Sequence, residues 1–354
     1  MNQKALIGMS GGVDSSVAAY LTQRTGIKCI GATMKLYDAG DTACCSADNI
    51  SDARAVAQRL GMEFHVLDFS AEFRKHVTDH FAESYESGLT PNPCIECNRH
   101  LKFSNFLDRA LSLGCDYMVT GHYARIQKDG NSDRYLLRKA KDEAKDQSYF
   151  LYGIPQEHLS RVLFPLGDLT KAEVRQIADE QGFINAKKKD SQDICFIPDG
   201  DYLAFLKRHT GKEYPAGNYL DLSGNVIGQH GGAVGYTIGQ RKGLGIALGA
   251  PAYVCSKDME KNTVTLGPNE ALFHTTLLAN DWNWLAFSAL TEPMKLQAKA
   301  RSRMVEQPAT VYPEENDYVR VVFDEPQRAL TPGQAVVLYD GDVVVGGGII
   351  REIL

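Results

Sequence analysis

The sequence predicts an α/β fold with a parallel sheet, followed by two β-rich parts. Short apolar runs alternate with helical patterns over residues 1–200, which is typical of parallel strands joined by helices. Glycine-rich segments dominate residues 201–271, and strand-like alternation of apolar and polar residues dominates residues 272–354. A chain of 354 residues corresponds to two or three domains of ordinary size, and we expect three with these boundaries.

Four apolar runs in the first part have the length and flanking turns of strands. They are Ala5–Gly8, Lys28–Met34, Phe64–Phe69 and Tyr117–Thr120. The helices between them are expected near residues 14–25, 47–60, 70–87 and 100–113. The second of these helices has apolar residues at i, i+3, i+4 and i+7, so one face should pack on the sheet. A capping box from Thr170 to Glu173 predicts a further helix that ends at Gly182.

The β-rich parts begin after a short predicted helix at Tyr202–His209. Residues 218–228 predict a hairpin that closes at Ser223-Gly224-Asn225. The later predicted strands are Lys295–Arg303, Ala309–Tyr312, Tyr318–Phe323, Ala335–Tyr339 and Val343–Ile349. We therefore expect a small β-rich domain and then a C-terminal β-barrel.

The net charge of −6 and the pI near 5.9 do not by themselves suggest a nucleic-acid partner, because phosphate recognition leaves a basic footprint. A global charge can nevertheless hide a local patch. The candidates are Lys187–Lys189, Lys207–His209 and the alternating Lys295, Lys299, Arg301 and Arg303. Such charge runs are more often solvated faces than binding surfaces, so they need independent support.

The chain has no apolar stretch near the roughly 18 to 20 residues that cross a bilayer, and its N-terminus enters a predicted strand at once. We expect neither a membrane segment nor a signal peptide. Eight cysteines in such a chain are expected to have chemical or metal roles rather than to form a disulfide scaffold. These features predict a cytoplasmic protein without a membrane partner.

The first predicted strand is followed at once by Gly8-Met9-Ser10-Gly11-Gly12-Val13-Asp14-Ser15. Adjacent glycines let the backbone approach a ligand, and the unpaired N–H groups and dipole at a helix start favour an anion. No lysine follows the glycines, unlike in the GxxxxGK(S/T) phosphate loop. Because ligands of parallel sheets bind at the carboxyl ends of the strands, we expect this run, Met34 and Gly121 to form a nucleotide pocket.

A second motif places two cysteines just before a helix predicted to begin near Leu101. It reads Pro91-Asn92-Pro93-Cys94-Ile95-Glu96-Cys97-Asn98-Arg99. The field at a helix start would lower the pKa of a thiol below its usual value of roughly 8.5, so Cys97 is a candidate nucleophile. Half of a zinc site and two unreactive loop cysteines are alternative interpretations, although no second CxxC completes the four-cysteine spacing.

A third motif, at residues 190–197, places Cys195 on an apolar, strand-like segment. A cysteine between two large apolar residues is by itself more often a buried small hydrophobe. Together, however, the three motifs resemble those of the bacterial tRNA-specific 2-thiouridylases, members of the ATP pyrophosphatase (PP-loop) superfamily. The matching segments are SGGVDS, NPCIECNRHLKF, DSQDICFI, residues 121–123 and residues 145–151. The likeness spans nearly the whole chain.

The resemblance implies a HUP-type PP-loop catalytic domain that uses ATP and Mg²⁺. In that family ATP adenylates the C2 oxygen of the wobble uridine, position 34 of tRNA, and sulfur from a protein persulfide replaces this oxygen. By motif match Cys195 would carry the persulfide, and Cys97 would be the partner nucleophile that ends in a disulfide with Cys195. A persulfide carrier or sulfide would be the sulfur donor.

The same resemblance assigns the binding residues. Those for ATP would be Gly8, Met9, Ser10, Gly11, Gly12, Val13, Asp14, Ser15, Met34 and Gly121. Those facing the target base would be Asn92, Pro93 and Cys94. Those touching tRNA would be Lys145, Asp146, Gln147, Ser302 and Arg303.

One position departs from the family pattern, because many members have aspartate where this chain has Cys94. Cys94, Cys97 and Cys195 would then supply three thiolates, the ligand count of a [4Fe–4S] cluster with one open iron. Cluster-dependent sulfur insertion is therefore an alternative to the persulfide route. Two further alternatives are another PP-loop enzyme, such as a thiolase of a different tRNA base, and an iron–sulfur or zinc protein that only binds nucleotide and RNA.

Overall fold

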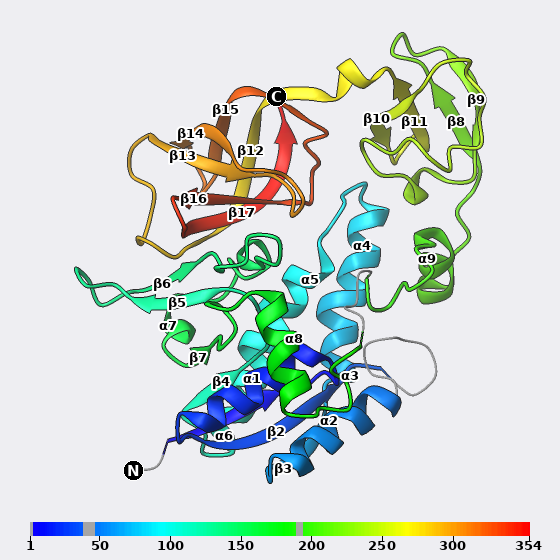
Figure 1. The fold of residues 1–354 in the computed structure, drawn as a ribbon. Coiled ribbons are helices and arrows are strands. Elements are labelled where there is room, and N and C mark those ends of the chain that lie inside the picture. The colour runs from blue at the N-terminus through cyan, green and yellow to red at the C-terminus, as the bar shows by residue number, and fades with distance from the viewer. Residues whose placement is uncertain (1–2, 38–46, 189–193) are drawn as a thin grey trace.

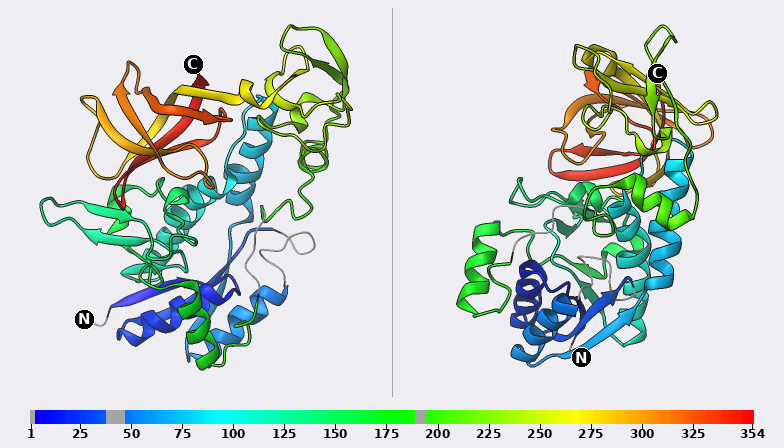
Figure 2. Two further views of the ribbon diagram at one scale, coloured as in Figure 1. Left: turned by 45° about the horizontal axis from the view of Figure 1, so that its top comes forward. Right: turned by 90° about the vertical axis from the view of Figure 1, so that its right-hand side faces the viewer.

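The computed structural model describes residues 3–37, 47–188 and 194–354. It has three parts: an α/β part at the bottom of Figure 1, a β-barrel at the upper left and a smaller β-rich part at the upper right. The two further views in Figure 2 show the N-terminus on the α/β part and the C-terminus on the barrel. The predicted fold class is confirmed.

A five-stranded parallel sheet forms the base of the α/β part, with the strand order β3-β2-β1-β4-β7. Its strands are β1 (Lys4–Gly8), β2 (Lys28–Lys35), β3 (Glu63–Asp68), β4 (Tyr117–Val119) and β7 (Val162–Leu163). Successive side chains of β1 point to opposite faces, so Leu6 joins one hydrophobic cluster while Ala5 and Ile7 join another. Both faces of the sheet are therefore covered.

Helices pack on both faces. One face carries α1 (Val13–Arg24), α2 (Ala47–Arg59) and α8 (Lys171–Glu180), whose buried residues share a cluster with Ile7. The other face carries two continuous helical runs. The first is α3 (Ser70–Phe73), η1 (Arg74–Asp79) and α4 (His80–Glu86), and the second is α5 (Pro93–Glu96), η2 (Cys97–Phe106) and α6 (Leu107–Ser112). Segments η1 and η2 are π-helical, a geometry that is frequent at functional sites.

The start of the second helical run corrects the prediction that a helix begins near Leu101. The helix begins at Pro93, because proline has the φ of a first helical residue and Asn92 caps the N-terminus of the helix. The Asn92 Oδ1 accepts a hydrogen bond from the Cys94 N–H at 3.2 Å. Cys94 and Cys97 therefore lie within the first turns of the helix rather than in a loop before it.

A linking segment, not predicted from the sequence, joins the α/β part to the barrel. It contains β5 (Arg125–Lys128), β6 (Tyr135–Arg138), η3 (Ser148–Phe150) and α7 (Gln156–Leu159). Strand β6 pairs with the barrel through Arg138 and Val343. Arg125 and Arg138 each donate a hydrogen bond of 2.9 Å to the carboxylate of Asp342, so an ionic contact accompanies the strand pairing.

Six antiparallel strands form the barrel, which closes where its first strand pairs with its last. They are β12 (Phe273–Trp284), β13 (Met294–Lys299), β14 (Gln307–Pro313), β15 (Val319–Arg328), β16 (Ala335–Asp340) and β17 (Val343–Ile353). The predicted strand Lys295–Arg303 is too long, because a turn follows β13, in which the Met304 N–H donates to the Arg301 carbonyl at 3.1 Å. Lys299, Arg301 and Arg303 therefore do not share a strand face.

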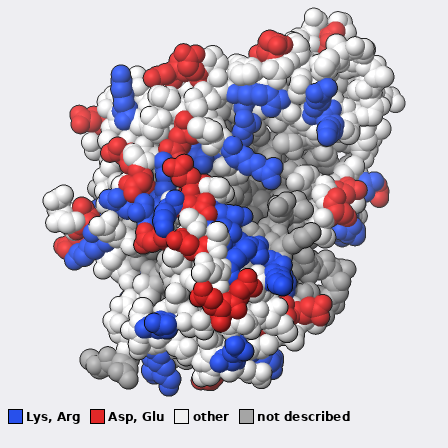
Figure 3. Space-filling view, viewed as in Figure 1, with Lys and Arg blue, Asp and Glu red and all other residues white. Residues whose placement is uncertain are grey.

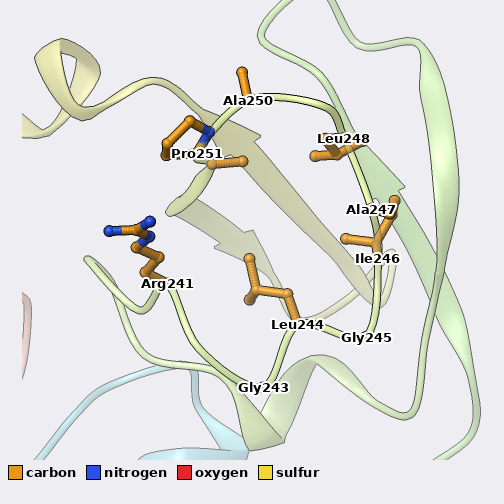
Figure 4. Close-up of a pocket in the computed structure, with 10 residues that line it drawn as sticks. Arg241, Gly243, Leu244, Gly245, Ile246, Ala247, Leu248, Ala250 and Pro251 are labelled. Atoms are coloured by element: carbon orange, nitrogen blue, oxygen red, sulfur yellow. The ribbon is translucent and has the colours of Figure 1, made fainter.

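The central part follows α9 (Tyr202–Thr210) and contains a four-stranded sheet with the order β10-β11-β8-β9. Its elements are β8 (Gly217–Leu220), β9 (Val226–His230), η4 (Ala233–Gly235), β10 (Tyr253–Asp258), β11 (Thr263–Gly267) and η5 (Asn269–Leu272). The predicted β8–β9 hairpin is confirmed. A pocket of about 470 Å³ lies inside the loop 241–252 (Figure 4). None of the helices within the described ranges is long and apolar enough to cross a membrane.

Candidate functional site

The glycine-rich loop joins β1 to α1 in the geometry expected from the sequence. Gly11 has a φ of +74°, and a Cβ there would lie 2.3 Å from the Asn49 carbonyl oxygen, so only glycine fits. Ser15 Oγ accepts from the Ser10 N–H at 3.2 Å and donates to the Gly12 carbonyl at 3.0 Å, which closes the loop. No side chain of the described residues caps α1 at Gly12. The backbone N–H groups of its first turn thus remain available to an anion.

The predicted nucleotide-binding segments meet at one edge of the sheet. A Cβ on Gly121 would lie 2.7 Å from the Asp14 carbonyl carbon and from the Ser15 nitrogen, so Gly121 lies directly against the loop backbone. Strand β2 runs parallel to β1, with Ala32 opposite Gly8 and Met34 two residues further along. The structure therefore brings together the loop, Met34 and Gly121.

A lysine that the sequence did not indicate lies beside this loop. Lys171, the first residue of α8, contacts both carboxylate oxygens of Asp14 at 2.7 and 2.8 Å. The hydroxyl of Tyr123 donates to the same carboxylate at 2.8 Å, and the ammonium lies over the tyrosine ring at 5.8 Å. The capping box at Thr170 was the only sequence signal near Lys171, and it did not show what the helix start would face.

A second lysine comes from the basic run Lys187–Lys189, which the sequence presented as a possible surface patch. Lys188 Nζ lies 2.6 Å from Asp52 Oδ2, 2.5 Å from Asn49 Oδ1 and 3.3 Å from the Gly11 carbonyl. Lys187, in contrast, is exposed. The loop is thus flanked by two ammonium groups that could neutralise phosphate charge.

A buried amide also supports the loop. Asn185 is 3% exposed, and its Nδ2 donates to the Gly11 carbonyl at 3.0 Å and to Ser16 Oγ at 2.9 Å. On the other side of Gly121, burial and the charge of Lys102 hold the pKa of His122 well below its ordinary value. A neutral His122, hydrogen-bonded to Thr120 at 2.7 Å, fits a structural role better than that of a charged phosphate ligand.

The two candidate sulfur-carrying residues lie against one hydrophobic cluster. Cys97 is 9% exposed within this cluster, and the half-buried Cys195 packs against it. The ring of Phe196 lies 5.9 Å from that of Phe73 and 5.3 Å from that of Phe81, on the first helical run. This run also contacts the helix that carries Cys97.

The predicted strand-like conformation at Cys195 is wrong. The residue lies in a turn in which the Ile197 N–H donates to the Ile194 carbonyl at 2.9 Å. Phe196 and Ile197 are buried because the turn docks into the aromatic cluster, not because they belong to a sheet. Residues 190–193 of the motif lie outside the described residues.

Comparisons with known proteins give the family. Three family models match in order: the tRNA methyl transferase HUP domain over residues 3–199, the tRNA methyl transferase PRC-barrel domain over 203–268 and the Aminomethyltransferase beta-barrel domain over 274–350. The tRNA-specific 2-thiouridylase MnmA of Clostridioides difficile (strain 630) is 49% identical over 359 residues, covering 100% of this chain and 99% of the relative. The chain belongs to the tRNA-specific 2-thiouridylase family.

A second relative supports the same family. The tRNA-specific 2-thiouridylase MnmA of Acetivibrio thermocellus is 50% identical over 356 residues, with 99% of each chain covered. Among solved structures, a 4-thiouridine synthetase in complex with RNA and ATP aligns over 59% of this chain and 50% of that chain, with 20% identity and a TM-score of 0.38.

The three cysteines considered as cluster ligands are not arranged as a metal site. Among residues 3–37, 47–188 and 194–354, no group of three or more His, Cys, Asp or Glu side chains could hold a metal ion. Cys94 is exposed whereas Cys97 is buried, and both begin the same helical run. In this conformation Cys94, Cys97 and Cys195 do not form the set of three thiolate ligands that a [4Fe–4S] cluster needs.

The segment around Lys145, Asp146 and Gln147 lies next to the turn at Gly121. Gln147 exchanges hydrogen bonds of 2.9 Å with the backbone of Tyr123, through its own N–H and its Oε1. Asp146 accepts hydrogen bonds from the Ala140 N–H at 2.9 Å and from a serine hydroxyl at 2.7 Å. These bonds hold the segment near the loop and fix the backbone that carries Lys145.

Ser302 and Arg303 lie in the turn after β13. Burial and the nearby charge of Arg328 lower the pKa of the adjacent Arg301, so two arginines lie close together there. Arg328 contacts the central part, because its Nη2 donates to the Gly239 carbonyl at 3.5 Å. Figure 3 shows Lys and Arg side chains around the hollow between the barrel and the central part, while acidic side chains gather farther to the left.

Proposed function

We propose that this protein is a tRNA-uridine 2-sulfurtransferase, which uses ATP to replace the C2 oxygen of the wobble uridine, position 34 of tRNA, with sulfur. The observation that carries the proposal is that the glycine-rich loop has the geometry that the ATP-dependent activity of this family requires. Relatives named for this activity match the whole chain at about half identity, and β1 leads into an uncapped helix start suited to phosphate. We infer that the enzyme works in the cytoplasm on tRNA.

The first step is activation of the base. The C2 oxygen attacks the α-phosphorus of ATP and pyrophosphate leaves, which converts a poor leaving group into AMP. We assign ATP binding to residues 8–15, Met34 and Gly121, with Lys171 and Lys188 offsetting phosphate charge. Mg²⁺ would be held mainly by the phosphates, because this ion keeps most of its waters and takes few carboxylates.

The second step is sulfur transfer. A donor first leaves a persulfide on Cys195. The Cys97 thiolate then attacks the Cys195 sulfur, a disulfide forms between the two residues, and hydrosulfide is released. Hydrosulfide adds to the activated C2 and displaces AMP. The sulfane sulfur gains two electrons as the two cysteines are oxidised, so an external thiol reductant must restore them before the next cycle.

The recognition of the target base and of the tRNA is part of the proposal. Asn92, Pro93 and Cys94 would face the uridine, which must leave its stack to reach the site. Lys145, Asp146, Gln147, Ser302 and Arg303 would contact the tRNA. The support is their location, since the first group begins the Cys97 helix, the 145–147 segment adjoins Gly121, and Ser302 and Arg303 follow β13.

The alternative route uses a [4Fe–4S] cluster, and iron content separates the two. With a cluster, anaerobically reconstituted protein would hold about four irons, which Cys94→Ala would remove. Iron-free protein that keeps full activity supports the persulfide route. The described residues do not form the required ligand set, and we derive no step through a cluster.

The decisive experiment is mass spectrometry of nucleosides after incubating tRNA with the protein, ATP, Mg²⁺, a persulfide donor and a reductant. The expected product is a uridine heavier by the difference between sulfur and oxygen, formed together with AMP. Cys195→Ser and Cys97→Ser should abolish the sulfur-containing product when a persulfide donor is used. Cys255→Ser, in the central part, is the matched control. A wild-type protein that forms neither AMP nor the heavier uridine would be a binding module instead.

A further inference from the structure

An ion pair joins the Cys97 helix to the barrel. Arg99 lies on η2, two residues after Cys97, and Asp281 lies on β12. The guanidinium makes two parallel contacts with the carboxylate, Nη1 to Oδ2 at 2.5 Å and Nη2 to Oδ1 at 3.0 Å. This two-point geometry fixes orientation as well as distance.

The barrel side of this contact has an unusual backbone. Asp281 has a φ of +53°, and the pairing of β12 with β17 shifts register between Asn280 and Asn283. Such a bulge redirects the side chains that it carries. The Nδ2 of Asn283 donates to the Tyr152 carbonyl at 2.6 Å and to the Ile154 carbonyl at 2.8 Å, so the bulge is anchored on the linking segment.

The helix side is held on more than one face. Residues two apart on a helix point to nearly opposite sides, so Arg99 faces away from Cys97, which is buried in the core. Between them, Asn98 is 4% exposed and donates from Nδ2 to the Phe150 carbonyl at 2.9 Å. A Cβ on Gly153 would lie 3.5 to 3.7 Å from the Arg99 stem, which thus packs on the same segment. The ion pair therefore fixes the rotation of the helix about its axis.

We propose that Asp281 is a positioning residue for Cys97: by holding Arg99 it couples the seating of the barrel to the orientation of the thiol on the π-helical turn. This inference rests on the proposed role of Cys97. Burial alone would raise the pKa of Asp281, but its hydrogen bonds and charge interaction with Arg99 hold the pKa below its ordinary value. The pair therefore stays ionised at neutral pH.

The test compares two ion pairs of the barrel, one with the Cys97 helix and one with the linking segment. Asp281→Asn removes the charge and keeps a residue that tolerates positive φ, while Asp342→Asn weakens the contact with Arg125 and Arg138, away from the cysteine helix. Two readouts are taken: kcat for thiolation, and the rate of Cys97 alkylation by iodoacetamide, measured by peptide mass spectrometry in a Cys94→Ser background. The alkylation readout needs neither ATP nor tRNA.

Asp281→Asn is expected to lower kcat roughly tenfold or more and to speed Cys97 alkylation to a similar degree, with KM for ATP unchanged. Arg99→Lys keeps the charge but loses the fork geometry, so it should show the same change to a smaller extent. Asp342→Asn should alter neither readout. The proposal is overturned if Asp281→Asn leaves Cys97 alkylation unchanged or if Asp342→Asn changes it equally. If wild-type protein makes no thiolated product, the proposed function is wrong. The rate of Cys97 alkylation then still tests whether Asp281 positions the Cys97 helix.

Discussion

At the residue scale, the glycine-rich loop between β1 and α1 contacts two lysines that are distant from it in sequence. Lys171 holds Asp14, and Lys188 reaches the Gly11 carbonyl while paired with Asp52. Neither contact follows from a local pattern, since one lysine begins a helix and the other belongs to a run that looks like a solvated face. The loop itself could be predicted because its glycines and its place after a strand are local features.

Lys188→Gln should weaken ATP binding, because it removes a positive charge beside the loop where the phosphates are expected. We expect KM for ATP to rise by about tenfold or more, with a smaller change in KM for tRNA. Initial-rate kinetics on both substrates measure this. Lys187→Gln is the control, since this neighbour is exposed. Equal effects of the two substitutions would show that Lys188 acts only through general charge.

Lys257 provides a test at another site, between the central part and α4. Its Nζ is buried, has no hydrogen-bond partner among the described residues and lies 5.7 Å from the centre of the Tyr85 ring. Burial lowers the pKa of Lys257 from its ordinary 10.5 to about 8. Because the buried charged form is disfavoured, folding carries a cost below pH 8 that is relieved as the pH rises toward 10.5.

Lys257→Met should therefore stabilise the protein at pH 7, by up to about 3 kcal/mol, and the gain should shrink between pH 8 and pH 10.5. Urea denaturation of both proteins at pH 7 and at pH 10 measures the difference. A gain of the same size at both pH values would mean that packing, rather than the buried charge, is responsible. A loss at pH 7 would show that the contact with Tyr85 outweighs the desolvation of the ammonium.

At the element scale, strands β1 to β4 and the helices α1, α2 and α8 lie within two residues of their predicted bounds, whereas the two-residue edge strand β7 was not predicted. Their hydrophobic periods and caps are local properties, and the capping box at Thr170 is present as predicted. The departures have physical reasons. Proline and Asn92 begin a helix earlier than apolar spacing suggests, and the segment around Cys195 is apolar because a turn docks into a tertiary cluster.

Thr170→Ala tests how this cap serves the site. The threonine hydroxyl accepts from the Glu173 N–H, and the Glu173 carboxylate accepts from the Thr170 N–H. This cap lies at the N-terminus of α8, where Lys171 contacts Asp14. Losing the cap should cost about 1 kcal/mol of unfolding free energy and should also weaken ATP binding. Chemical denaturation and ATP titration measure the two effects.

The matched control is a cap on another helix. Asp201 Oδ1 accepts from the Ala204 N–H at 2.9 Å at the start of α9, which leads into the central part. Asp201→Ala should lose a similar amount of stability without changing ATP affinity. If the two variants bind ATP equally well, the position of Lys171 does not depend on the cap.

At the scale of the whole molecule, the arrangement of the three parts relative to one another could not be predicted from the sequence. The β-barrel was predictable from alternating strands, but its contacts through Asp281 with the Cys97 helix and through Asp342 with the linking segment join residues more than 180 positions apart. The proximity of Cys97 and Cys195 to one cluster also arises from tertiary packing. The motif resemblance identified these two cysteines as candidates for sulfur transfer. Their placement against one cluster depends on tertiary contacts of aromatic side chains, which no local sequence pattern predicts.

The proposed tRNA contacts at Ser302 and Arg303 lead to a prediction about the neighbouring junction of the barrel and the central part. Arg328 is held there by Asn269, whose Oδ1 accepts from Nε at 2.8 Å, and by the Tyr253 ring at 5.1 Å. No acidic side chain among the described residues forms an ion pair with Arg328 or with Arg301. Two neighbouring guanidinium groups without carboxylate partners suit a phosphodiester backbone, and their fixed position lowers the entropy lost on binding.

Arg301→Gln and Arg328→Gln should each weaken tRNA binding several-fold and lower the slope of log Kd against log salt concentration by about one. ATP affinity should stay unchanged, because the substitutions lie on the barrel rather than at the loop. Arg320→Gln is the control, since this barrel arginine is already paired with Glu314 at 2.6 Å. Filter binding of tRNA at several salt concentrations measures the effect. If Arg320→Gln weakens binding as much, or if ATP affinity falls in parallel with tRNA affinity, the loss reflects global charge or misfolding, and the tRNA takes another path.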